Sequence, residues 1–142
     1  MFIPNYVNYA HFYQRQQQEK KAYDILQQGL KIHPQSADIW HSLGLWYVRN
    51  SPKEKGVEAL NKAASLSPDN ARYQYVYAVA LADKDQKQAI KVLEDSRKKH
   101  SGDIDTLSAL SYFYNQLGDK TKADYYQNEI KEVQSMEKLL NR

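Results

Sequence analysis

Two histidines come nearest, among the side chains of this sequence, to the spacing of a metal site. His11 and His41 fall on helices that we expect to be neighbours, where the two imidazoles could share a metal ion. Two histidines without a third ligand seldom make a site, because protein metal sites usually use three or four ligands. We therefore interpret both as polar residues that line a surface, and we expect no metal and no cofactor.

A basic run at residues 97–100, Arg-Lys-Lys-His, is the second candidate for chemistry. Its cations could contact a phosphate or an acidic partner. The alternative is a solvated helix end whose positive charges complement the helix dipole, and we favour this interpretation. Because the net charge of the sequence is only +3 and both signs are mixed along it, we expect no nucleic-acid partner.

Catalytic arrangements do not stand out in this sequence. The absence of cysteine excludes disulfides, thiolate nucleophiles and cysteine-ligated metals, and with them the Cys-x-x-Cys-His motif that attaches haem. We find no Ser-His-Asp set, no paired carboxylates and no phosphate-binding loop above chance. We therefore predict that the chain is not an enzyme and has no catalytic residues.

Membrane insertion and export signals are also missing from the sequence. No apolar run approaches the roughly 20 residues that a membrane-spanning helix needs, so we expect no membrane insertion. The start of the chain lacks a basic region followed by an apolar core, so it does not resemble a signal peptide. This predicts a cytoplasmic location, or a periplasmic one if the chain is a fragment of an exported protein.

Eight positions that recur at an interval of 34 residues organise the chain that carries these side chains. In the clearest copy they are Trp40, Leu43, Gly44, Tyr47, Gly56, Leu60, Ala63 and Pro68. In the copy before it they are Tyr6, Tyr9, Ala10, Tyr13, Ala22, Leu26, Gly29 and Pro34. The period predicts four repeats, at residues 3–36, 37–70, 71–103 and 104–137, with a C-terminal cap that reaches residue 142.

Apolar residues at helical spacing predict two helices in each repeat. Ser51 and Pro52 suggest an N-cap and a first helical residue for the second helix of the clearest copy. Residues 73–79 alternate as a strand would, but the flanking copies favour a helix. No glycine or proline interrupts residues 120–140, which predicts one long last helix. We expect four of its residues to cover the end of the stack: Ile130, Val133, Met136 and Leu140.

The order Trp, Leu-Gly, Tyr, small, large apolar, Ala, Pro in residues 40–68 resembles a tetratricopeptide (TPR) repeat. The resemblance implies an all-α fold, a right-handed α-solenoid of about four helix-turn-helix units with an extended C-terminal capping helix. It would make residues 1–142 a single TPR domain. Residues 70–81 are more faintly similar to TPR segments of exported bacterial proteins.

A protein-interaction scaffold is the function that this resemblance implies. In TPR proteins the first helices of the repeats line a concave groove that binds a peptide or helix of a protein partner. Transferred to this sequence, the groove residues are Val7, His11, Arg15, His41, Leu45, Arg49, Tyr75, Val79, Tyr112 and Asn115. The Lys, Asn and Arg clamp of TPR domains that bind chaperone C-termini is absent from the comparable positions, which argues against that subclass.

The alternative function is structural: a self-association module of a larger protein or complex, with no peptide ligand of its own. Short repeat arrays often pack through their terminal helices, so the apolar side of the last helix could form a homodimer. The residues that we expect at such an interface are Val133, Met136 and Leu140.

Overall fold

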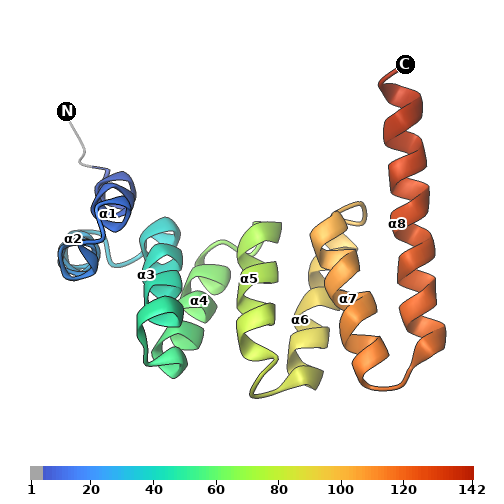
Figure 1. Cartoon of the computed structure of the whole chain (residues 1–142), viewed down its shortest axis with the longest axis horizontal. Helices are drawn as coiled ribbons and strands as arrows, with labels where there is room; N and C mark the ends of the chain where they lie inside the picture. Colours follow the sequence, from blue (N-terminus) through green and yellow to red (C-terminus); the bar gives the residue numbers. More distant parts are fainter. Residues whose placement is uncertain (1–4) are drawn as a thin grey trace. The chain divides into compact units, whose positions relative to one another are not determined.

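A computed structural model describes residues 5–142, and within this range it contains eight α-helices and no strand (Figure 1). The first four helices are α1 (Tyr6–Arg15), α2 (Glu19–Ile32), α3 (Ala37–Asn50) and α4 (Lys53–Leu66). The last four are α5 (Ala71–Leu81), α6 (Gln86–Lys99), α7 (Ile104–Gln116) and α8 (Lys120–Leu140). The predicted all-α class is confirmed. The start of the first repeat at residue 3 lies outside the described residues.

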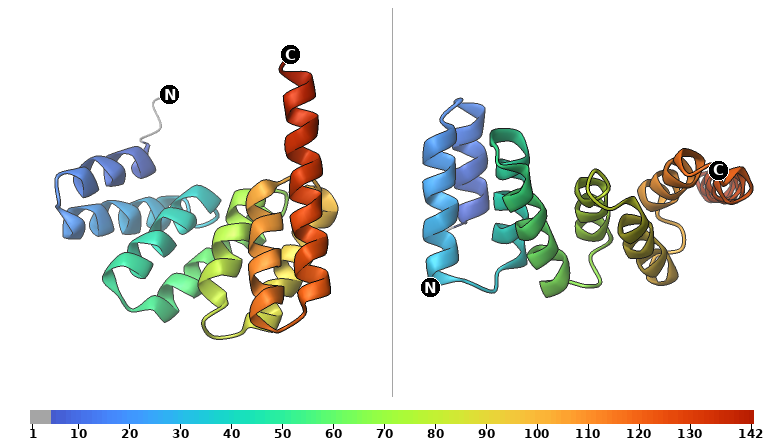
Figure 2. Two further views of the ribbon diagram at one scale, coloured as in Figure 1. Left: turned by 45° about the vertical axis from the view of Figure 1, so that its right-hand side comes forward. Right: turned by 90° about the horizontal axis from the view of Figure 1, so that it is seen from below.

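The chain divides into two compact units, the N-terminal unit (Met1–Pro68) and the C-terminal unit (Asp69–Arg142). Each unit contains four helices, and consecutive helices of each unit pack against one another. The first helices of the repeats also meet within each unit, since α1 contacts α3 and α5 contacts α7. Figure 2 shows the paired helices of both units from two further directions.

The core of the N-terminal unit is built from repeat positions of α1, α2 and α3. Trp46 adds a link between α2 and α3, because its indole Nε1 donates to the carbonyl oxygen of Glu19 at 2.9 Å. Its ring also lies 4.7 Å from that of Tyr23, centroid to centroid. Trp46 therefore packs neighbouring repeats together. The buried residues of this core are Tyr6, Ala10, Ala22, Leu26, Leu30, Ile39, Leu43 and Tyr47.

Two glycines allow α3 and α4 to approach closely. A Cβ atom on Gly44 would lie only 2.6 Å from Cγ of Leu60. A Cβ atom on Gly56 would lie 3.0 Å from the carbonyl oxygen of Gly44, which is backbone and cannot rotate away. Small residues therefore bring the two helices of this pair together.

The C-terminal unit has a core of its own, formed by α5 to α8. Residues 73–79 lie inside α5, so the helical interpretation of this alternating segment is confirmed. Tyr126 is buried where the repeat pattern breaks at Gln127, and it replaces the missing apolar side chain. The buried residues of this core are Ala78, Ala89, Ile90, Leu93, Leu107, Ala109, Leu110, Phe113, Tyr126 and Ile130.

The helix caps agree with the sequence in the C-terminal unit and differ from it at Ser51. Asn70, Asp85, Asp103 and Asp119 each accept a hydrogen bond from the backbone N–H three residues later. Ser51 does not cap α4, and the prediction was wrong. Its own N–H donates to the carbonyl oxygen of Tyr47 at 2.6 Å, so it belongs to the last turn of α3, which it ends with a φ of +75°.

The end of α8 also differs from the sequence-based expectation. Ile130 is buried and Val133 packs against the core, but Met136 and Leu140 are 58% and 79% exposed. The reason is length, because α8 has 21 residues and α7 only 13. The last turns of α8 extend beyond α7 (Figure 1), so these two residues do not cover the stack.

Candidate protein-binding faces

The candidate residues of the N-terminal unit form one surface, which we call the N-terminal face. Val7, His11 and Arg15 are spaced four apart along α1, and His41, Leu45 and Arg49 are spaced four apart along α3. Residues four apart lie on the same side of a helix, and α1 contacts α3. His11, Arg15 and Arg49 are exposed, and the other three are half-buried.

The two arginines of the N-terminal face differ in their partners. Arg49 Nη2 lies 3.7 Å from Oε2 of Glu19, and Nδ2 of Asn50 donates to the same oxygen at 3.2 Å. Within residues 5–142, Arg15 forms no ion pair. The guanidinium of Arg15 is therefore available to the carboxylate of a partner, whereas the guanidinium of Arg49 already pairs with Glu19.

The candidate residues of the C-terminal unit form a second surface, the C-terminal face, from Tyr75 and Val79 of α5 and Tyr112 and Asn115 of α7. Val79 and Tyr112 are 42% and 59% exposed, so both present apolar surface to solvent. At one end of this face, Arg72 is neutralised. Its guanidinium lies 5.5 Å from the centre of the Tyr75 ring, and its Nη1 lies 3.6 Å from Oδ2 of Asp105.

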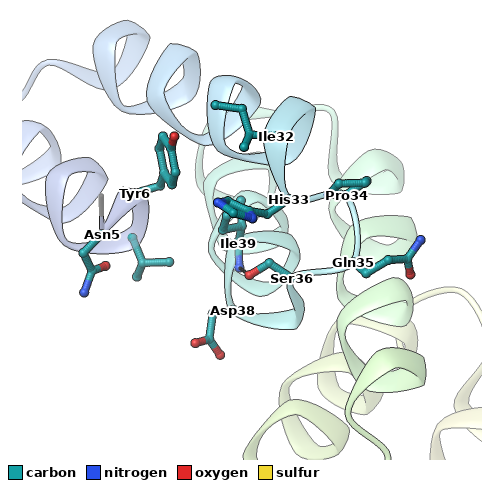
Figure 3. Close-up of a pocket in the computed structure, with 10 residues that line it drawn as sticks. Asn5, Tyr6, Ile32, His33, Pro34, Gln35, Ser36, Asp38 and Ile39 are labelled. Atoms are coloured by element: carbon teal, nitrogen blue, oxygen red, sulfur yellow. Dashed lines mark hydrogen bonds between the residues drawn. The ribbon is translucent and has the colours of Figure 1, made fainter. Parts of the chain in front are cut away.

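A cavity of about 700 Å³ adjoins the N-terminal face, between the start of α1, the end of α2 and the start of α3 (Figure 3). Val7 and Asp38 belong to its walls as well as to the first helices. Inside it, the ring of His33 lies edge-on to Tyr6 at a centroid distance of 6.0 Å. Sequence reasoning missed this cavity, because the loop at residues 33–36 carries no motif. The lining residues are Asn5, Tyr6, Val7, Ile32, His33, Pro34, Gln35, Ser36, Asp38 and Ile39.

The basic run at residues 97–100 is engaged within the C-terminal unit. Arg97 pairs with Glu129, Lys98 Nζ lies 3.8 Å from Oδ1 of Asp95, and Lys99 Nζ lies 3.0 Å from Oδ1 of Asp69. Because Arg97, Lys98 and Lys99 each have an acidic neighbour, the run is an ion-paired helix end, and Arg97 is less solvated than we expected.

The largest pKa shift in the C-terminal unit belongs to a tyrosine that packs against Glu94 in the core. Oε1 of Glu94 accepts hydrogen bonds from the hydroxyls of Tyr114 at 3.0 Å and Tyr126 at 2.5 Å. Burial and this hydrogen bond raise the pKa of Tyr114 to about 12, and the same causes raise the pKa of Tyr126. Both phenols stay neutral at physiological pH and act as donors that tie α6 to α7 and α8.

The described part of the chain offers neither a candidate metal cluster nor a candidate membrane-spanning helix. In residues 5–142, no three His, Cys, Asp or Glu side chains gather in a way that could hold a metal ion. Over the same residues, no helix combines the length and the apolar character that crossing a membrane requires.

The paired helices and their accessible first-helix faces define the class of the protein: an all-α solenoid of TPR type. MamA has a similar structure, with a TM-score of 0.82 at 18% identity over 93% of this chain and 78% of MamA. A second structure, MamA MSR-1, gives a TM-score of 0.76 at 20% identity over 93% of this chain and 76% of that one. PilF of Pseudomonas aeruginosa gives 0.77 at 19% identity, over 89% of this chain and 59% of PilF. These identities establish the fold alone.

The family follows from the sequence itself. The sequence model of the cytochrome c-type biogenesis protein H TPR domain matches residues 14–140. The chain therefore belongs to this TPR family. No curated protein matches the sequence significantly. The resemblance to TPR repeats that the 34-residue period indicated is confirmed.

Proposed function

We propose that this chain is a non-catalytic scaffold that binds a peptide or helix of a protein partner on the faces of its first helices. The observation that carries the proposal is the accessibility of these faces. Tyr112 and Val79 expose apolar surface on the C-terminal face, and His11, Arg15 and Arg49 expose donors on the N-terminal face. Tyrosine and arginine are the residue types that often dominate binding energy at protein interfaces.

The name of the family suggests the process in which the partner takes part. Because the family is that of a cytochrome c-type biogenesis protein, we propose that the partner is a protein of c-type cytochrome assembly. A cytochrome c chain without its haem is therefore the first defined probe.

A triple variant of the two faces tests the proposed function. We expect His41→Glu/Tyr75→Ala/Tyr112→Ala to retain the helix content of the wild type and to bind the haem-free cytochrome c at least ten-fold more weakly. Loss of two aromatic contacts of about 1–2 kcal/mol each accounts for an effect of this size. Fluorescence anisotropy with a labelled probe measures the affinity, and a pull-down with both proteins extends the comparison to other partners.

The matched control for this variant is Tyr9→Ala/Phe12→Ala. It removes two aromatic rings of α1 that are about half-exposed and lie outside both faces. We expect the control to bind as the wild type does. If the triple variant captures the same partners with the same affinity, the first-helix faces are not the binding surface.

A second candidate function is self-association through α8, favoured by the exposure of its last turns. Leu139 is exposed in addition to Met136 and Leu140, and Val133 is only half-buried. Burying such side chains against a second copy would contribute roughly 1.5–3 kcal/mol for each one that is fully covered. This would make the chain a structural module that assembles through its C-terminal helix.

Light scattering on the isolated chain tests self-association. If α8 forms a homodimer, the measured mass doubles with rising concentration, and Met136→Glu returns it to the monomer because the charge cannot be buried in the interface. Gln134→Glu adds the same charge to an exposed position on the other side of the helix and should leave the dimer intact. A monomer at all concentrations excludes this function.

A further inference from the structure

The net positive charge of the chain is confined to the N-terminal unit. This unit holds eight lysines and arginines against five acidic residues, whereas the C-terminal unit holds twelve of each. The first unit therefore accounts for the whole net charge of +3, and the second is neutral. A partner segment that meets the N-terminal unit encounters a positive potential.

Two of these cations, both arginines, stand at one end of the N-terminal face, and the other six are lysines of α2 and α4. Arg15 and Arg49 occupy the same position of successive 34-residue repeats, in the last turns of α1 and α3. Because α1 and α3 are in contact, the repeat places the two guanidinium groups at the same end of the face. Arginine binds carboxylates with a planar pair of N–H donors, so such a pair of side chains matches an acidic ligand.

The intramolecular partner of Arg49 shows that this end of the face accepts a carboxylate. Glu19 approaches Arg49 at 3.7 Å, and the two side chains are 37% and 44% exposed. An exposed pair of this kind is worth about 0–1 kcal/mol, so an external carboxylate can replace Glu19 at little cost. Arg15 has no ion-pair partner within the described residues.

Apolar side chains continue the face away from the arginines. Leu45 and Val7 are half-buried and lie one and two turns before the arginines on the same sides of their helices. The C-terminal face lacks this combination, because α5 and α7 carry a single arginine, Arg72, and Asp105 of α7 stands beside it. We propose that the N-terminal face binds an acidic segment of the partner, with carboxylates at Arg15 and Arg49 and an apolar side chain over Leu45. This inference rests on the proposed function and specifies the chemistry of its ligand.

Three synthetic helical peptides of equal length test the inference. They share a leucine pattern and carry glutamate, glutamine or lysine at the remaining positions, and fluorescence anisotropy measures the binding of each to the full chain. We expect the glutamate peptide to bind at least ten-fold more tightly than the glutamine peptide, and its affinity to fall as salt screens the charges. The lysine peptide should bind most weakly.

Variants of the two arginines test whether Arg15 and Arg49 account for the binding of the glutamate peptide. We expect Arg15→Glu/Arg49→Glu to lose at least ten-fold in affinity for the glutamate peptide. The control Lys31→Glu/Lys62→Glu makes the same change of net charge on exposed positions of α2 and α4 and should bind within two-fold of the wild type. Both arginines also stand where cations complement their own helix dipoles, so circular dichroism must show a folded chain. If the glutamate variant unfolds, Arg15→Gln/Arg49→Gln replaces it.

Three results would overturn the inference. Equal affinity for the glutamate and glutamine peptides overturns it and leaves the proposed function standing, because a peptide still binds. An equal loss in the lysine control shows that overall charge, and not the arginine pair, attracts the peptide. Tighter binding of a single-stranded DNA oligonucleotide than of the glutamate peptide, lost in the arginine variant, makes nucleic acid the ligand of this face.

Discussion

Replacing Gly44 with valine is expected to lower the free energy of unfolding by about 3 kcal/mol, at the upper end of the usual cost of overpacking. A Cβ atom at this position would stand 2.6 and 2.7 Å from two side-chain carbons of Leu60 and 3.1 Å from its backbone nitrogen. Leu60 is itself fully buried, so its side chain has no free space to enter. Helices α3 and α4 must therefore separate. Denaturant unfolding followed by circular dichroism measures the loss.

The same substitution at Gly102 is the matched control. The nearest atom to a Cβ there is Cγ2 of Val133 at 4.0 Å, and we expect a change of no more than about 0.5 kcal/mol. If Gly44→Val unfolds at the same denaturant concentration as the wild type, the close contact between α3 and α4 is wrong.

The features of the fold that follow from the 34-residue repeat period were predictable from the sequence. Glycine, alanine and proline at fixed intervals indicate where helices must pass closely and where they end, and these constraints are local in sequence. Ser51 shows the limit of such reasoning. The residues Ser-Pro-Lys-Glu suit a helix start, but whether serine ends the first helix or begins the second depends on the path of the turn between them.

The repeat pattern predicted which residues lie on the candidate faces, but it did not predict their ion-pair partners within the fold. Repeat register identifies which side chains of α1, α3, α5 and α7 stand on the faces, since residues four apart share a helix side. Register says nothing about which charges are already neutralised within the fold. Arg72 pairs with Asp105 beside an aromatic ring, and Arg49 shares Glu19 with Asn50, and the repeat period predicts neither pairing.

The structure therefore assigns different chemistry to two surfaces that the repeat makes equivalent. The N-terminal face is cationic and partly apolar, and the C-terminal face is aromatic and close to neutral. Residues that fix the repeat, such as Leu43 in the N-terminal unit and Ala78 in the C-terminal unit, are buried, whereas Tyr9 is 47% exposed. Specificity must therefore arise from the residues between the repeat positions, where selection for packing is weakest.

Replacing Arg97 with methionine is expected to cost roughly 2–3 kcal/mol. Arg97 donates to both carboxylate oxygens of Glu129 and to the hydroxyl of Tyr125, and it lies 5.3 Å from the centre of the Tyr126 ring. Removing one partner of a fully buried ion pair costs about 3–5 kcal/mol. We expect a smaller loss of stability here, because the side chains of Arg97 and Glu129 are still 24% and 20% exposed. Lys98→Met, which breaks only an exposed pair with Asp95, should change stability by less than about 0.5 kcal/mol.

The pH dependence of this loss tests its electrostatic origin. Burial raises the pKa of Glu129, but hydrogen bonds from Arg97 and Tyr125 outweigh burial and hold it below its ordinary value of 4.5. A carboxyl whose pKa is lowered by folding stabilises the fold fully above its unfolded pKa, and this contribution disappears as the pH falls through the folded pKa. The difference in unfolding free energy between the wild type and Arg97→Met should therefore be largest near pH 7 and shrink below about pH 4.

Adding Glu129→Gln to Arg97→Met should recover part of the loss, because no carboxylate is then left without its partner. A difference that stays constant from pH 7 to pH 3 would mean that Arg97 stabilises α6 against α8 by packing on Tyr125 and Tyr126 alone.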